Sequence, residues 1–365
     1  MQTPPNLLHW PDPVPLEVAA MADIAACRAL LREGSYTFFA ASLLLPRAVC
    51  HPASALYAFC RLADDAVDTG ENPHAALDAL RERLAAAYRG QPGAGAADRA
   101  LAAVVARFKI PRTLPEALLD GFEWDLAGRR YETLEEVQDY GARVAGSVGA
   151  MMALLMGVRS ADGLARACDL GVAMQLSNIA RDVGEDARMG RLYLPRQWLR
   201  EAGIDPDAWL ANPVFNPAIA ATVQRLLDAA ELLYRRVDAG VAQLPLACRP
   251  GINAARYLYA EIGHEVARRG LDSVSQRARV SALRKSGLML WSLVNLAPRV
   301  PFQPAPVLQA TRFLVDACTP VHFASGASAT RPAWWDVTGR LVWVLDLFER
   351  LERQDQLRHA PRSTG

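Results

Sequence analysis

A polar stretch near residue 180 carries side chains whose types and spacing could do chemistry. If the stretch is helical, Asn178, Asp182 and Asp186 fall at i, i+4 and i+8, and a helix of 3.6 residues per turn places them on one face. Ile179 and Val183 lie on the opposite side, where their apolar side chains predict burial. A column of oxygen ligands anchored by apolar residues suits a hard divalent cation such as Mg²⁺.

A second acidic segment has the same spacing. Tyr57, Arg61, Asp64, Asp65 and Asp68 fall at i, i+4, i+7, i+8 and i+11 and form one stripe on a helix. Carboxylates this close repel one another unless cations neutralise them. One such motif alone is more often a solvated acidic face, but the remaining positions of this helix are mostly apolar. Together with the first column, the stripe predicts two acidic faces directed into one cavity.

Two acidic columns around one cavity have an evident chemical use. Divalent cations held between them would bind a diphosphate through bridging oxygens. Arg61, Arg181 and Arg188 are placed to donate further hydrogen bonds to the phosphates. A neutralised diphosphate is a leaving group, and the carbon that it leaves becomes a carbocation. That chemistry requires a dry, apolar pocket, because water would quench the cation.

Composition places limits on the protein class. The 365 residues are 52% hydrophobic and 22% charged, enough for a sizeable core in one large or two ordinary domains. A net charge of +1 disfavours a nucleic-acid partner. The six cysteines form no C-x-x-C pair and are typical of reduced thiols in a cytoplasmic protein. The chain shows no signal-peptide pattern and no apolar run long enough to span a bilayer, so any membrane contact would be peripheral.

Apolar residues recur at helical spacing along the chain, and no strand alternation or fixed repeat is found. We therefore expect an all-α protein with a flexible arm at 1–15, one domain at 16–297 and a C-terminal helical extension with a disordered tail at 298–365. Pro52 is expected in the first turn of the helix that carries Tyr57. In the extension, apolar positions predict a helix near 335–353 that packs on the main body; lying on a membrane surface is the alternative.

Several motifs resemble the squalene and phytoene synthase family, in the family's order, over about residues 23 to 290. The two acidic segments resemble its aspartate-rich signatures, and other stretches are similar to its central and N-terminal motifs. Within the family the chain is most similar to bacterial 15-cis-phytoene synthases of carotenoid pathways. The matching stretches are Ser35-Tyr-Thr-Phe38, Tyr57-Ala-Phe-Cys-Arg-Leu-Ala-Asp-Asp-Ala-Val-Asp68, Tyr140-Gly-Ala-Arg-Val-Ala-Gly-Ser-Val-Gly149, Gln175-Leu-Ser-Asn-Ile-Ala-Arg-Asp-Val-Gly-Glu-Asp186 and Gly190-Arg-Leu-Tyr-Leu-Pro195.

The resemblance implies an all-α, single-domain isoprenoid-synthase fold around a central apolar cavity. It also implies the head-to-head condensation of two geranylgeranyl diphosphates through prephytoene diphosphate to 15-cis-phytoene. The implied cofactor is Mg²⁺ or Mn²⁺. No nicotinamide cofactor is implied, and the chain has no Gly-rich dinucleotide loop.

The resemblance also assigns roles to individual residues. Tyr140 is the candidate acid or base, with diphosphate itself as the alternative base, and Asp64, Asp68, Asp182 and Asp186 share the catalytic site. The metal ligands would come from Asp64, Asp65, Asp68, Asn178, Asp182 and Asp186. Substrate contacts would come from Ser35, Phe38, Tyr57, Arg61, Gln175, Arg181, Arg188, Tyr259 and Arg277.

Two alternatives stay open at this point. The same chemistry on farnesyl diphosphate would give squalene or dehydrosqualene, because the accepted chain length depends on the depth of the cavity. A non-catalytic relative acting as an assembly protein would be expected to have lost its acidic residues, and both columns are intact. A peripheral position at the inner membrane surface for product release and contact with downstream carotenoid enzymes are also left open.

Overall fold

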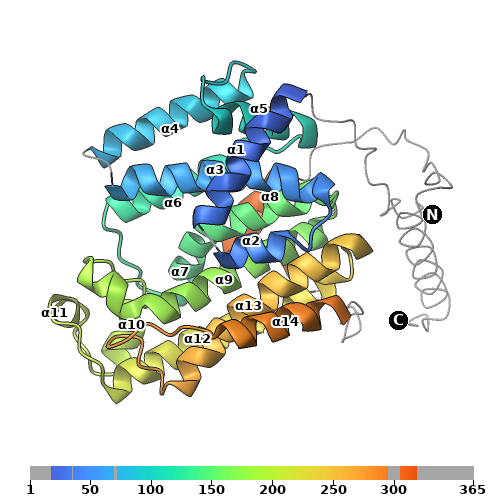
Figure 1. Cartoon of the computed structure of the whole chain (residues 1–365). Coiled ribbons are helices and arrows are strands. Elements are labelled where there is room, and N and C mark those ends of the chain that lie inside the picture. The colour runs from blue at the N-terminus through green and yellow to red at the C-terminus, as the bar shows by residue number, and fades with distance from the viewer. Residues whose placement is uncertain (1–17, 35, 70–71, 295–304, 319–365) are drawn as a thin grey trace, which may run out of the picture.

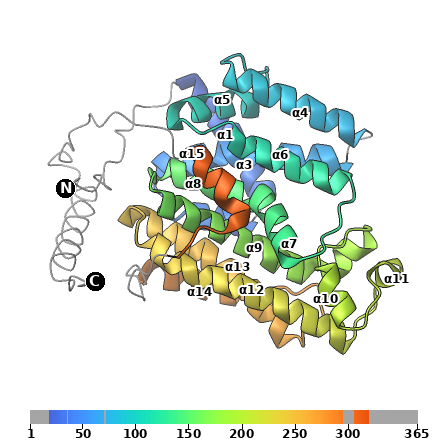
Figure 2. The same cartoon turned by 180° about the vertical axis from the view of Figure 1, so that it is seen from behind.

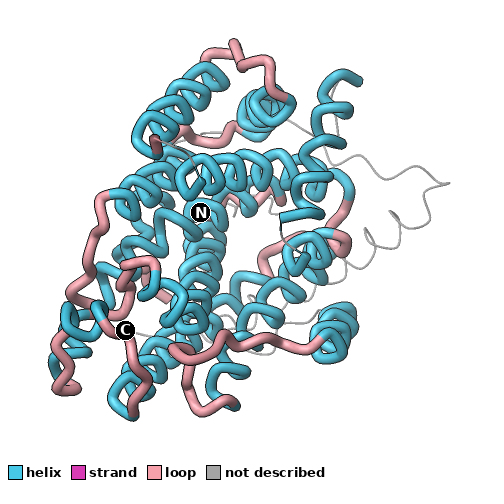
Figure 3. The backbone as a smooth tube through the Cα atoms, turned by 60° about the vertical axis from the view of Figure 1, so that its left-hand side comes forward, coloured by secondary structure: helices cyan, strands magenta, loops and turns pink. Residues whose placement is uncertain are grey.

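The computed structural model describes residues 18–34, 36–69, 72–294 and 305–318. Within these ranges, only the backbone is described at 18–20, 33–34, 36–38, 64 and 66–69. Every regular element in the described part of the chain is helical, which confirms the predicted all-α class (Figure 3). The elements are α1 (Val18–Gly34), α2 (Tyr36–Ser42), α3 (Arg47–Thr69), α4 (Pro73–Tyr88), α5 (Ala96–Phe108), α6 (Thr113–Leu126), α7 (Leu134–Gly141), η1 (Ala142–Gly146), α8 (Ser147–Leu155), α9 (Ala161–Arg188), α10 (Arg196–Glu201), α11 (Pro206–Ala211), α12 (Pro217–Val241), η2 (Leu246–Cys248), α13 (Arg249–Arg268), α14 (Ala282–Val294), η3 (Gln309–Thr311) and α15 (Arg312–Cys318).

The helices form two groups joined through α8 and α9. In the upper group of Figure 1, α1 packs on α3 and α5, and α4 packs on α3, α5 and α6. In the lower group, α9 contacts α12 and α13, and α13 also contacts α14. Seen from behind, α15 lies across α6, α8 and α9 (Figure 2). Helix α9 therefore occupies the centre of the fold, with neighbours on most of its circumference.

Local sequence signals define both ends of α9. The side chain of Ser160 caps its first turn by accepting a hydrogen bond from the Gly163 N–H at 3.1 Å. Arg188 lies in the last turn, where a positive charge interacts favourably with the helix dipole. Gly190, with φ +74°, then turns the chain away. The helix between these signals is 28 residues long and carries one of the two acidic columns.

Glycines let α9 pack unusually close to the preceding helices. A Cβ on Gly149 of α8 would lie 2.2 Å from the Ala167 carbonyl oxygen, and a Cβ on Gly171 would lie 2.3 Å from the Ala145 carbonyl oxygen. Only glycine fits at such backbone-to-backbone contacts. Between α7 and α8, the π-helical turn η1 is closed by a hydrogen bond from the Ser147 N–H to the Ala142 carbonyl oxygen.

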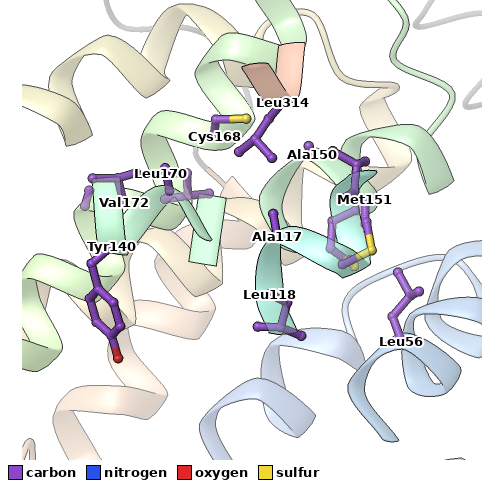
Figure 4. Packing of buried hydrophobic residues seen from close by; sticks show 14 of the residues in the cluster. Leu56, Ala117, Leu118, Tyr140, Ala150, Met151, Cys168, Leu170, Val172 and Leu314 are labelled. Carbon is purple, nitrogen blue, oxygen red and sulfur yellow. The ribbon is translucent and has the colours of Figure 1, made fainter. Parts of the chain in front are cut away.

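The core is continuous across both groups of helices. Figure 4 shows apolar side chains from α3, α6, α8, α9 and α15 packed around the α8–α9 contact, among them Leu56, Leu118, Met151, Leu170 and Leu314. Each of these five side chains is less than a tenth exposed. Their burial is the main stabilising term for a fold of this type.

The first part of the predicted C-terminal extension belongs to this core. Leu314, Val315 and Cys318 of α15 are buried, and α15 contacts α6, α8 and α9. The arm at 1–15 and the helix expected near 335–353 lie outside the described residues, so the division of the chain stays a prediction. No helix in the described part of the chain combines the length and apolarity needed to cross a membrane.

One predicted helix start was wrong. Helix α3 begins at Arg47, so Pro52 lies in its second turn and not in its first. The Pro46 carbonyl starts the helix by accepting from the N–H groups of Val49 and Cys50 at 2.9 and 2.8 Å. Pro52 lacks an N–H and cannot bond the carbonyl one turn before it. Neighbouring bonds and the buried face of α3 hold the helix in spite of this loss.

Candidate active site

The last third of α9 presents the polar face that its sequence predicts. Ile179 and Val183 are 3% and 4% exposed and face the core. Asn178, Asp182 and Asp186 lie on the other side of the helix and are partly exposed. The orientation of this acidic column is therefore confirmed, and its side chains stand at a boundary between the core and more open space.

Two arginines converge on the Asp182 carboxylate. Arg181 Nε lies 2.7 Å from Asp182 Oδ1, and Arg277 Nε lies 2.8 Å from the same oxygen. Arg277 also reaches Glu185 through Nη1 at 3.2 Å. The structure thus brings together three predicted site residues from α9 and from the segment before α14. These guanidinium groups are suited to move from the carboxylate to a phosphate, which they can bind in a bidentate manner.

Asp186 lies in an environment that opposes its charge. Burial, together with the nearby carboxylates of Asp182 and Asp125, raises the pKa of the Asp186 carboxyl group to about 7 against the lowering effect of Arg191. Like charges confined in a poorly solvated space cannot all ionise at low cost. A bound cation would relieve this repulsion, because its own charge would dominate the local field.

Asn178 adds an unsatisfied oxygen to the same face. Its Oδ1 atom is buried and accepts no hydrogen bond. Such an atom costs free energy unless a ligand or solvent completes its coordination. An amide oxygen one turn before a carboxylate is a ligand set that Mg²⁺ or Mn²⁺ accepts, so the residues of α9 fit a divalent cation.

The acidic segment of α3 is only partly described. Arg61 pairs with Asp65 through a 2.6 Å contact, with 39% and 45% of the two side chains exposed. Tyr57 stands one turn before Arg61 on the same helix. Asp64 and Asp68 lie on α3 where only the backbone is described.

Two further predicted site residues cannot be placed in full. Phe38 lies on α2 where only the backbone is described, and Ser35 lies outside the described residues. Among the side chains that the structure describes, no three His, Cys, Asp or Glu residues form a complete metal site. It therefore stays a prediction that the acidic segments of α3 and α9 bind one diphosphate together through divalent cations.

An apolar cavity of about 230 Å³ adjoins the polar face of α9. Its walls come from η1, α8, α9, α12 and α13, and most of the lining side chains are aliphatic or methionine. Gln175, Asn178 and Tyr259 line it and supply polar groups at one end. Two of the predicted substrate contacts, Gln175 and Tyr259, therefore lie at the cavity. The cavity lining, as described, includes no residue of α3.

Tyr140 lies beside the acidic end of α9 and is not part of the cavity lining. Its hydroxyl donates to Asp125 Oδ2 at 2.8 Å, and Tyr193 donates to Asp125 Oδ1 at 2.6 Å. In Figure 4 the Tyr140 oxygen points away from the labelled aliphatic side chains. Burial raises the pKa of Tyr140 well above its usual value, and the charge of Asp125 adds to the shift. Tyr140 is thus a neutral phenol at physiological pH.

Sequence reasoning missed Asp125, Tyr193 and their aromatic neighbour Tyr131. The Tyr131 ring is fully buried and stacks on Tyr193 with 5.9 Å between ring centres, and its hydroxyl has no hydrogen-bond partner. Tyr193 lies in a stretch that matched the family, which was a usable signal. Asp125 is one of four acidic residues on α6 and belongs to no aspartate-rich motif, so nothing in the sequence singled it out.

Arg188 does not join the other predicted phosphate contacts. Its Nη1 donates to the Val274 carbonyl oxygen at 3.2 Å, and the residue is exposed. At this point α9 and the segment before α14 approach closely, since a Cβ on Gly184 would lie 2.1 Å from the Val274 carbonyl oxygen. Arg188 thus stabilises the segment that carries Arg277.

Comparison with known proteins identifies the family of the chain. The family model described as squalene/phytoene synthase matches residues 31–284, and the chain belongs to this family. It is 49% identical to the phytoene synthase of Cereibacter sphaeroides over 347 residues, which cover 92% of this chain and 96% of that one. It is 53% identical to the phytoene synthase of Rhodobacter capsulatus over 309 residues, 82% and 90% of the two chains. Among solved structures, a dehydrosqualene synthase in complex with ligand superposes with a TM-score of 0.70 at 31% identity, covering 76% of this chain and 97% of that chain.

Proposed function

We propose that this chain is a phytoene synthase, a prenyltransferase that joins two geranylgeranyl diphosphates head to head and yields 15-cis-phytoene through prephytoene diphosphate. Phytoene synthases that are 49% and 53% identical over most of the chain support this function. The structural observation that carries the proposal is the position of Gln175 and Asn178 on α9, at the polar end of a cavity whose remaining walls are largely apolar.

The residues at the polar end are suited to diphosphate. Arg181 and Arg277 are held on Asp182, within reach of a group that enters beside Asn178. Asn178 and Asp182 of α9, with Asp64 and Asp68 of α3, would hold Mg²⁺ or Mn²⁺, and Asp65 and Asp186 would lie nearby. When bound, such a cation neutralises the charge of a diphosphate and makes it a better leaving group.

The cavity protects the cationic carbon after diphosphate leaves. Val148, Met152, Leu170 and Met174 line it, and none of these side chains offers a nucleophile that would capture a carbocation, apart from the weakly basic methionine sulfur. Exclusion of water keeps the cation available for attack by the double bond of the second substrate. The walls thus assist the reaction because they offer the carbocation neither water nor a strong nucleophile.

The tyrosine pair limits how the last proton can leave. Tyr140 is a neutral phenol whose hydroxyl donates a hydrogen bond to Asp125, so it is not available as a phenolate base. This geometry favours the departing diphosphate as the proton acceptor and assigns Tyr140 to positioning at the acidic end. The C40 product is a hydrocarbon, and its transfer to a membrane surface or to a later carotenoid enzyme stays a proposal.

Product identification tests the proposed function. The purified full-length chain is incubated with Mg²⁺ and either farnesyl or geranylgeranyl diphosphate, with and without NADPH as the hydride donor that squalene formation would need, and the extracted hydrocarbon is identified by mass. We expect a C40 hydrocarbon from the C20 substrate. A C30 hydrocarbon from the C15 substrate, with no product from the C20 substrate, would assign the chain to squalene or dehydrosqualene synthesis. If neither substrate gave a hydrocarbon, the chain would instead be a non-catalytic relative.

A further inference from the structure

The apolar cavity extends along α9 from a polar end to an end enclosed by buried residues. Asn178 lines it at the polar end and is partly exposed, whereas Arg166 and Gly163 line it nearer the start of the helix and are buried; we call this the closed end. At about 1.5 Å per residue, the distance along α9 is roughly 18 Å from Asn178 to Arg166 and roughly 22 Å from Asn178 to Gly163. The cavity is therefore a channel whose depth can be read along one helix.

Helix α8 runs antiparallel to α9 along this channel. A Cβ on Gly171 would meet Ala145, and a Cβ on Gly149 would meet Ala167. Residue numbers therefore rise along η1 and α8 in the direction in which they fall along α9. Met156 directly follows α8 and lines the cavity. It therefore stands at the closed end, near the first turn of α9.

Helix α12 also runs antiparallel to α9 and leads to the closed end. Its Tyr234 hydroxyl lies 3.0 Å from that of Ser177, late in α9. Further along α12, a Cβ on Gly240 would lie 2.3 Å from the Cβ of Arg166, early in α9. Leu244, which lines the cavity just beyond α12, thus lies with Met156 and Val241 at the closed end.

A buried ion cluster fixes the wall behind these side chains. Arg166 is 2% exposed, and its Nε lies 3.0 Å from Asp169 Oδ2; the Nε of Arg236 lies 3.0 Å from the same oxygen. Arg166 also donates to the carbonyl oxygens of Ala305 and Pro306 at 3.2 and 3.3 Å. A buried charge bound on several sides is costly to displace, so this end of the channel cannot yield to a longer ligand.

We propose that Met156 and Leu244, held in place by the fixed Arg166 wall, set the length of prenyl chain that the cavity accepts. This inference rests on the proposed function. With carbon–carbon bonds of about 1.5 Å, an extended C20 chain measures roughly 20 Å and a C15 chain roughly 15 Å. The channel therefore suits the C20 chain, leaves its end empty with the C15 chain, and excludes anything longer.

Two substitutions of opposite effect test the proposal. Leu244→Phe shortens the channel and should lower kcat/KM for geranylgeranyl diphosphate by at least about tenfold while changing that for farnesyl diphosphate by less than about threefold. Met156→Ala lengthens the channel and should raise kcat/KM for a C25 prenyl diphosphate by about tenfold over the wild type. Both are measured as diphosphate release by the full-length protein.

Leu232→Phe is the matched control, because it makes the same exchange on α12 at a side chain that is 61% exposed; it should behave as the wild type. Thermal unfolding identifies a variant that fails to fold, and in that case the other variant decides. If the wild type makes the C40 hydrocarbon but neither variant shifts the ratio of the kcat/KM values between chain lengths, the closed end does not set length. A wild type that makes no C40 hydrocarbon would instead overturn the proposed function.

Discussion

At the scale of single residues, Asp182 is the side chain on which the account depends. It accepts hydrogen bonds from both Arg181 and Arg277, so the same carboxylate that would hold a cation also positions two guanidinium groups that would bind phosphate. Asn178, one turn earlier, carries the unsatisfied oxygen. Both residue types and their spacing were predicted from the sequence, because helical periodicity alone brings them to one face.

Replacement of Asp182 tests this assignment. Asp182→Ala should lower kcat by at least about 100-fold, the range seen when a group that stabilises developing charge is removed, while the helical circular-dichroism signal stays intact. Asp228→Ala is the control, because this carboxylate on α12 is exposed and accepts a hydrogen bond from Gln224; it should keep full activity. Wild-type turnover in Asp182→Ala would remove Asp182 from the site.

Asp125 yields a second prediction, on stability. Asp125→Ala leaves the buried hydroxyls of Tyr140 and Tyr193 without their acceptor, and each unsatisfied group costs about 1–3 kcal/mol. The free energy of unfolding from urea titration should fall accordingly, whereas Asp125→Asn retains an acceptor oxygen and should fall less. Equal stability of the alanine variant and the wild type would show that the phenols find other partners.

The sequence does not show that the members of this cluster meet, nor that the ion cluster behind the cavity is buried. Asp125, Tyr140 and Tyr193 come from three different elements, α6, α7 and the loop after α9, and no local spacing records that they meet. Arg166 and Asp169 are three residues apart on α9, which is usual for an exposed ion pair. Only the packing of α12 and the chain near 305 reveals that both are buried.

At the scale of elements, the close approach of α8 and α9 determines the shape of the cavity. A methyl group at Gly149 would stand 2.2 Å from a backbone oxygen of α9, and a backbone atom inside two packed helices cannot move aside cheaply. The contact also fixes the register that brings Met156 to the closed end. The sequence contains these glycines, but a glycine within a helix by itself indicates only a less stable helix and does not indicate close contact with another helix.

Alanine substitution tests this contact. Gly149→Ala should lower the free energy of unfolding by about 1–3 kcal/mol or more through overpacking. Gly287→Ala on α14 is the matched control, since nothing lies within 4 Å of its added Cβ; it should be neutral or stabilise by up to about 1 kcal/mol. Chemical denaturation measures both, and a neutral Gly149→Ala would mean that the two helices can separate.

The attachment of α14 to α13 predicts a pH dependence. Glu261, 2% exposed, accepts from Arg284 Nε at 2.9 Å and from Arg268 Nη2 at 2.6 Å. Burial alone would raise its pKa, but the hydrogen bonds from Arg284, Arg268 and His264 outweigh burial and lower the pKa of Glu261 to about 2. A lowered folded-state pKa contributes stability above the unfolded value near 4.5, and this is lost as pH falls toward 2.

Glu261→Gln should therefore be less stable than the wild type at pH 7, by an amount of the order of 2 kcal/mol because the arginines are half exposed. The difference should shrink between pH 4.5 and 2, as followed by thermal unfolding at stepped pH. A difference that stays constant over this interval would show that the carboxylate charge does not contribute.

At the scale of the whole molecule, the helices assemble a channel with a charged mouth and a fixed end. Periodicity and stop signals predicted the helical class and most helices, because burial of one face is a local property of sequence. The depth of the channel, the position of Tyr140 outside its lining and the burial of α15 against the core depend on contacts between distant segments. These features follow only from the assembled fold.

The central claim is that the acidic segments of α3 and α9 bind one diphosphate through shared divalent cations. The most direct measurement is the anomalous scattering of Mn²⁺ in crystals of the full-length protein grown with a non-hydrolysable prenyl diphosphate analogue. We predict Mn²⁺ peaks within about 2.0–2.3 Å of oxygens from Asn178 and Asp182, with further ligands from Asp64 and Asp68. An analogue bound in the cavity without Mn²⁺, or with Mn²⁺ that touches only one of the two helices, would contradict it.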